Sequence, residues 1–87
     1  MNRVLVPSPL RSYTGGAAEV TGHGATVGEV MANLDREYPG MRFRMIDEQD
    51  RIRPHIKFAV GIEFVWSLDA PVEDGDDVHI IAALSGG

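Results

Sequence analysis

The sequence predicts an α+β roll, in which one helix packs against one face of a small sheet and the other face stays open to water. The patterns along the chain run strand, strand, helix and then further strands. The 87 residues suffice for one domain, and 44% of them are hydrophobic, which indicates a folded but thin core. One helix cannot cover both faces of a sheet of four or five strands.

Two short strands are expected before the helix. Residues 4–6 form an apolar run that ends at Pro7, and residues 17–21 form a second run that ends at Gly22. A Thr-Gly-Gly turn signal at residues 14–16 lies between them. Two strands with a glycine-bearing connection suggest a hairpin, and we expect the last strand of the chain to pair beside the first.

The helix pattern is the clearest feature of the chain. Apolar residues fall at i, i+3, i+4, i+7 and i+11, which is one face of a helix: Val27, Val30, Met31, Leu34 and Tyr38. Thr26 and Glu29 form a capping box, in which the threonine hydroxyl accepts the amide of residue 29 and the glutamate reaches back to the amide of residue 26. Pro39 and Gly40 predict the end of the helix.

The second half of the chain predicts further strands. A short helical turn is expected at Phe43 and Ile46, and a solvated loop follows at residues 47–51. Alternating or continuous apolar residues then predict strands at residues 56–60, 64–66 and 78–84.

The last four residues, Leu84, Ser85, Gly86 and Gly87, carry the chemical signal. Glycine loses the most conformational freedom on ordering, so we expect a folded domain over residues 1–83 and a flexible tail over residues 84–87. Four residues span at most about 13 Å and can enter a narrow channel, where the unhindered Gly87 carboxylate can meet ATP. An acyl-adenylate formed there is open to a sulfur or amine nucleophile. A frayed end without function is the alternative.

The final strand predicts a docking surface. Val78, Ile80 and Ala82 lie on one face of this strand, and His79, Ile81 and Ala83 lie on the other. Only one set can face the helix, so apolar residues remain on the open face. The predicted partner-binding residues are Ile81, Ala83, Leu84 and Ser85.

Composition excludes several classes of function. Eight Lys and Arg against 13 Asp and Glu give a net charge of −5, which disfavours nucleic acid and anionic membranes as partners. Without cysteine the chain has no disulfide and no thiolate site. With no signal-like segment, a small cytoplasmic protein is expected. The three histidines lack ligand spacing, so no metal site is predicted.

Four arginines form a local basic stretch: Arg42, Arg44, Arg51 and Arg53. Such a stretch usually consists of loop side chains that are solvated and have no partner. Contact with an acidic partner surface is the alternative.

Taken in order, these motifs resemble the ThiS/MoaD family of ubiquitin-like sulfur carriers. The resemblance rests on residues 73–78, which include an Asp-Gly-Asp turn, on residues 80–87, and on residues 14–16 and 26–40. It implies the β-grasp fold, a mixed sheet of four to five strands packed on one main helix. The early segments look like the branch of carriers that serves a cysteine synthase.

The resemblance also implies a reaction cycle. An adenylating enzyme similar to the ubiquitin-activating enzyme uses ATP to activate Gly87, with Gly86 beside it, and sulfur then replaces AMP. The resulting thiocarboxylate donates sulfur to an acceptor such as a cysteine synthase. The protein is then a carrier rather than an enzyme and binds no cofactor of its own. A metalloprotease is a further candidate partner.

Three alternatives stay open on the sequence. The chain could be the small subunit of molybdopterin synthase, a ubiquitin-like modifier joined to lysine amines, or a binding domain without tail chemistry. The Thr-Gly-Gly element at residues 14–16 favours sulfur transfer for amino-acid biosynthesis over the first of these.

Overall fold

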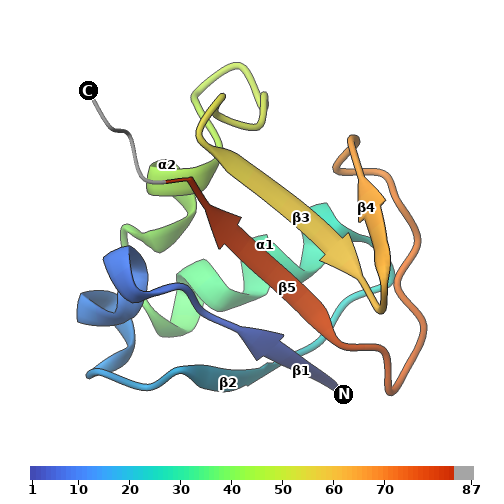
Figure 1. Ribbon diagram of the computed structural model, residues 1–87, viewed down its shortest axis with the longest axis horizontal. Helices are drawn as coiled ribbons and strands as arrows, with labels where there is room; N and C mark the ends of the chain where they lie inside the picture. The colour runs from blue at the N-terminus through green and yellow to red at the C-terminus, as the bar shows by residue number, and fades with distance from the viewer. Residues whose placement is uncertain (84–87) are drawn as a thin grey trace.

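The computed structural model describes residues 1–83, in which a five-stranded sheet packs against one long helix (Figure 1). The elements in chain order are β1 (Asn2–Leu5), the 3₁₀ helix η1 (Ser8–Thr14), β2 (Glu19–Gly22), α1 (Val27–Glu37), α2 (Met41–Met45), β3 (Ile56–Val60), β4 (Glu63–Val65) and β5 (Val78–Ala82). The tail predicted at residues 84–87 lies outside the described residues, so its boundary stays a prediction.

The sheet is mixed and has the order β2-β1-β5-β3-β4. β1 pairs antiparallel with β2 and parallel with β5, and β3 pairs antiparallel with both β5 and β4. Figure 1 shows β5, in red, between β1 and β3 at the centre of the sheet. The last strand therefore lies beside the first, as the sequence predicts.

Helix α1 covers one face of the sheet with the residues that the periodic pattern predicts. Val27, Val30, Met31 and Leu34 are buried, while Tyr38 caps the end of the helix and is half-buried. They pack with residues of the sheet into one core, whose largest side chain is the fully buried Phe58. The other face of the sheet has no covering helix among residues 1–83, which confirms the predicted roll.

The start of α1 is held by a cap and by a neighbouring loop. Thr26 Oγ1 accepts the Glu29 amide at 3.1 Å, as predicted, but the Glu29 carboxylate accepts the Ala25 amide at 2.9 Å rather than that of residue 26. The Gly28 amide donates to the Leu68 carbonyl at 2.8 Å. A Cβ at residue 28 would lie 3.1 Å from that oxygen, so glycine allows the close approach.

The connection between the first two strands differs from a simple turn. β1 and β2 are the predicted antiparallel pair, but η1 fills the space between them and places Leu10 and Thr14 in buried positions. The 3₁₀ helix begins with a proline in its first turn and ends at Gly15, whose φ of 66° is in the left-handed region. Apolar periodicity does not detect such a helix, because its turns are too few to repeat a pattern.

Candidate functional site

Strand β5 ends at Ala82, so that Ile81 lies in the strand and Ala83 directly after it. The side chains of Val78 and Ile80 are buried in the core, whereas Ile81 is 37% exposed and Ala83 is exposed. The Ala83 amide donates to the His55 carbonyl at 2.8 Å, which extends the pairing of β5 with β3 by one residue. The pairing of β5 with β3 is thus described as far as Ala83.

The four tail residues of the prediction lie outside residues 1–83. They are Leu84, Ser85, Gly86 and Gly87, and their roles stay predictions. Ile81 and Ala83, by contrast, do lie on the open face of the sheet, where a partner can reach them.

The open face also holds an aromatic pair that the sequence analysis did not select. Phe64 in β4 lies opposite Ala59 in β3 and is 55% exposed. Trp66, two residues later, is 73% exposed, and its ring centroid lies 6.1 Å from that of Phe64 in a stacked arrangement. The alternation of residues 64 and 66 was the available signal, because both must lie on one face of a strand.

A lysine joins the aromatic pair to the predicted docking residue. Lys57 lies opposite Ile81 in the register of β3 and β5, and its ammonium lies 5.8 Å from the centroid of the Trp66 ring. A cation at this distance from an indole is attracted to the face of the ring. Ile81, Lys57 and Trp66 therefore form one continuous row across three neighbouring segments. Exposed apolar side chains grouped in this way are typical of an interaction surface.

The acidic turn before β5 serves the fold. Asn2 is buried, and its Nδ2 donates to the carbonyls of Glu73 at 2.8 Å and Asp76 at 2.9 Å. Gly75, with a φ of 91°, donates its amide to the Met1 carbonyl at 3.0 Å. These bonds tie the start of β1 to the turn that precedes β5, so the Asp-Gly-Asp motif closes the central parallel pair of strands.

One ion pair at this turn shifts two pKa values. The Arg3 guanidinium donates to Asp77 at 2.8 Å, and this hydrogen bond lowers the pKa of the Asp77 carboxyl, although partial burial opposes the effect. The same hydrogen bond, together with the charges of Asp77 and Glu19, raises the pKa of Arg3. Within residues 1–83, no group of three His, Asp or Glu side chains is arranged to hold a metal ion.

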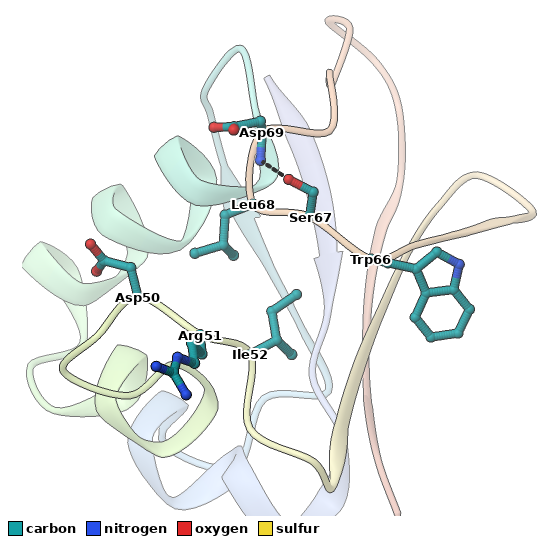
Figure 2. Close-up of a pocket in the computed structure, with 7 residues that line it drawn as sticks. All are labelled: Asp50, Arg51, Ile52, Trp66, Ser67, Leu68 and Asp69. Carbon is teal, nitrogen blue, oxygen red and sulfur yellow. Dashed lines mark hydrogen bonds between the residues drawn. The ribbon is translucent and has the colours of Figure 1, made fainter.

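A cavity of about 560 Å³ lies between the loop at residues 50–52 and the segment at residues 66–69 (Figure 2). Ser67 Oγ accepts the Asp69 amide at 3.1 Å, so the hydroxyl is part of a local turn. Figure 2 shows the Trp66 indole turned away from the other six residues that line the cavity. The cavity contains none of the predicted site residues, and we assign no reaction to it.

None of the helices in residues 1–83 has the length and apolar character that a membrane span requires.

Comparison with known proteins identifies the family. Residues 4–87 match the ThiS family. The sulfur carrier protein CysO of Mycobacterium tuberculosis (strain ATCC 25618 / H37Rv) is 33% identical over 89 residues, which cover 97% of this chain and 96% of that protein. Small archaeal modifier protein 3 of Haloferax volcanii is 33% identical over 66 residues, which cover 72% of this chain and 71% of that protein.

Solved structures agree with this result. A chain in the crystal structure of the Amycolatopsis orientalis BexX/CysO complex has a TM-score of 0.92 at 33% identity, with 100% of both chains covered. Mycobacterium tuberculosis CysO has a TM-score of 0.91 at 30% identity, with 97% of this chain and 100% of that chain covered. The predicted β-grasp fold and the predicted family of sulfur carriers are confirmed, and the chain belongs to the ThiS family.

Proposed function

We propose that this protein is a sulfur carrier whose reactive group is the carboxylate of Gly87. The observation that carries the proposal is the extent of the family match, which runs from residue 4 in β1 through residue 87. The match therefore includes both the folded body and the Gly86-Gly87 end. CysO proteins that align over nearly the whole chain support the same function.

The chemistry proceeds in two steps. A carboxylate oxygen of Gly87 attacks the α-phosphorus of ATP, and pyrophosphate leaves to give an acyl-adenylate. A sulfide then attacks the carbonyl carbon of Gly87, the bond to the phosphate oxygen breaks, and AMP leaves. The product is a thiocarboxylate in which one oxygen has been replaced by one sulfur. Both steps take place in the adenylating partner, so this protein acts as a substrate and carrier and not as an enzyme.

The folded body provides recognition rather than catalysis. Ordering the backbone of four tail residues costs about 4–8 kcal/mol. Contacts of the body with the enzyme must offset part of that cost. Ile81 and Ala83 on the open face are suited to this role because they are apolar, exposed and next to the tail.

Amino-acid biosynthesis is the sulfur-accepting pathway that we propose. The near full-length CysO relatives support this branch, which the Thr-Gly-Gly element at residues 14–16 also favours. The partners are then an adenylating enzyme, an acceptor such as a cysteine synthase and, at a later step, a metalloprotease. Adenylation consumes ATP, so we place the protein in the cytoplasm.

Protein modification is the second candidate function. It is favoured by the likeness to small archaeal modifier protein 3. In this case a lysine amine of a target protein, instead of sulfide, attacks the carbonyl carbon of the acyl-adenylate. The bond to the phosphate oxygen breaks, AMP leaves and the amine loses a proton, so the product is an isopeptide bond and no sulfur enters the chain.

Exchange of labelled pyrophosphate into ATP tests the first step. With the adenylating enzyme of the same organism present, we expect exchange that depends on this protein and that is lost when Gly87 is deleted. The deletion variant should keep the circular dichroism spectrum of the full chain, because residue 87 lies beyond the last strand. Exchange that is unchanged by the deletion would contradict the proposal.

A further inference from the structure

Basic residues lie at the end of the sheet where β5 ends. A cavity of about 210 Å³ there is lined by Ala82 and Ala83 of the final segment and by Arg44 and His55, among others. A second cavity, of about 260 Å³, is lined by Arg44, His55, Arg53 and Phe43. Arg44 and His55 border both cavities. Figure 1 shows that β5 ends close to α2, the helix that carries Arg44.

The local packing fixes the direction of one of these arginines. Arg53 Nε donates to the Phe43 carbonyl at 2.7 Å, and its guanidinium carbon lies 4.6 Å from the centroid of the Phe43 ring. Stacking on an aromatic ring is typical of guanidinium groups and reduces their freedom. The remaining N–H donors of Arg53 are held in place before any partner binds, so less conformational entropy is lost on binding.

The basic residues of this stretch differ in their acidic partners. Arg42 forms an ion pair with Asp50 at 2.9 Å, and the nearby Asp47 carboxylate accepts the backbone amides of Gln49 and Arg51. Within residues 1–83, neither Arg44 nor Arg53 forms an ion pair with an acidic side chain. The charge of Arg53 helps to lower the pKa of the Asp47 carboxyl and so is partly compensated, whereas the charge of Arg44 remains available at this end of a protein whose net charge is −5.

We propose that Arg44 and Arg53, together with His55, form a docking surface for acidic side chains of the enzyme that adenylates the tail. The inference rests on the proposed function, because an enzyme that takes in residues 84–87 must surround Ala83 at the mouth of its channel. Arg44 lines the same cavity as Ala83 and so lies near the rim of that channel. Carboxylates on the rim would pair with the two guanidinium groups and would place the tail in line with the channel.

Charge complementarity supports this choice of partner. A strongly acidic body is repelled by an acidic enzyme surface except where positive charge is exposed. The basic surface therefore selects one orientation of the carrier, the one in which the tail points at the channel. The paired charges increase the association rate at low salt and disfavour incorrect orientations.

Matched charge reversals test the proposal. Arg44→Glu and Arg36→Glu each change the net charge from −5 to −7, since each replaces +1 with −1. Arg36 is exposed near the end of α1 and borders neither cavity. The probe is the adenylating enzyme of the same organism. Its Kd for each variant is measured by fluorescence anisotropy at low and high salt.

We expect Arg44→Glu to raise the Kd about tenfold at low salt and Arg36→Glu to raise it less than about twofold. The difference should shrink at high salt, because salt screens exposed charges. The Arg44→Gln variant should fall between the wild-type chain and Arg44→Glu. Equal effects of the two reversals, or none, would overturn the docking surface.

Two further outcomes separate this inference from others. If the wild-type chain binds the enzyme and supports pyrophosphate exchange but Arg44→Glu behaves like Arg36→Glu, the docking surface is wrong and the carrier function stands. If the wild-type chain supports no exchange, the proposed function itself fails. Binding of pyrophosphate alone to the wild-type chain, lost in Arg44→Glu, would overturn the acidic protein surface in favour of a nucleotide phosphate.

Discussion

The two ends of strand β5 use charged residues in opposite ways. At its start, Arg3 pairs with Asp77, and the amino group of Met1 pairs with Asp74, so the charges compensate one another on the surface of the same chain. At its end, neither Arg44 nor Arg53 forms an ion pair with an acidic side chain of residues 1–83, although the charge of Arg53 helps to lower the pKa of Asp47. The first arrangement closes the sheet. The second leaves donors available to another protein, close to Ala83.

This contrast explains why the acidic turn at residues 73–77 and the basic stretch at residues 42–53, both charged segments in the sequence, have different roles. The acidic turn is tied to β1 by three backbone carbonyls or amides, which only the fold can bring together. The arginines of the basic stretch differ from one another. Arg42 forms an ion pair with Asp50, whereas Arg44 and Arg53 form none with an acidic side chain of residues 1–83.

Loss of the buried amide of Asn2 should have the largest effect on stability. Asn2→Ala leaves the carbonyls of Glu73 and Asp76 without their donor in a buried site, which costs about 2 kcal/mol of unfolding free energy. Asn33→Ala is the control, because the Asn33 amide donates to the His23 carbonyl in an exposed position. Urea denaturation should show a much smaller loss for the control. A similar loss in both variants would contradict the structural role of the acidic turn.

A charge on the open face of β5 should slow activation without unfolding the protein. We expect Ile81→Asp to lower the rate of adenylation about tenfold, because it places a solvated carboxylate in an apolar contact. Thr21→Asp, on the exposed edge strand β2, is the matched control and should leave the rate nearly unchanged. Initial rates of pyrophosphate release measure both variants. If the two rates are equal, Ile81 does not contact the enzyme.

The smallest effect is expected from the ion pair at the start of β5. The pKa of Asp77 lies below its ordinary value of 3.8, mainly because Arg3 donates a hydrogen bond to it. The stability that this pair contributes is therefore present above pH 3.8 and is lost as the pH falls through the lower pKa of the folded state. Asp77→Asn should reduce the loss of stability on acidification.

A second carboxylate sets the limit of that effect. Backbone amides, chiefly that of Arg51, also lower the pKa of Asp47, so acid sensitivity should be reduced in Asp77→Asn but not abolished. Urea denaturation at a series of acidic pH values measures the difference. Parallel stability curves for the wild-type chain and the variant would show that the Arg3–Asp77 pair contributes nothing.

Much of this fold could be predicted from the sequence, because α1 and β3 repeat apolar residues at the spacing of their own secondary structure. The pairing of the last strand with the first could also be predicted. The 3₁₀ helix η1 was not, since it is too short to show a period and depends on the burial of Leu10 and Thr14. Part of the site could be predicted, because the alternation of side chains along a strand places Ile81 and Ala83 on the open face.

The neighbours of the site could not be predicted in the same way. Lys57 and Trp66 are nine residues apart and meet only because β3 and β4 are paired. Arg42 forms an ion pair and Arg44 does not, and this difference depends on the position of Asp50 in a folded loop. Such contacts belong to tertiary structure, and local patterns contain no information about them.

Intact-mass spectrometry of the product tests the carrier function most directly. The chain is incubated with ATP, the adenylating enzyme and a sulfide source. We expect its mass to increase by the difference between one sulfur and one oxygen, with the change located at Gly87 by fragmentation. An unchanged mass, under conditions in which a known carrier of the family is converted, would contradict the account.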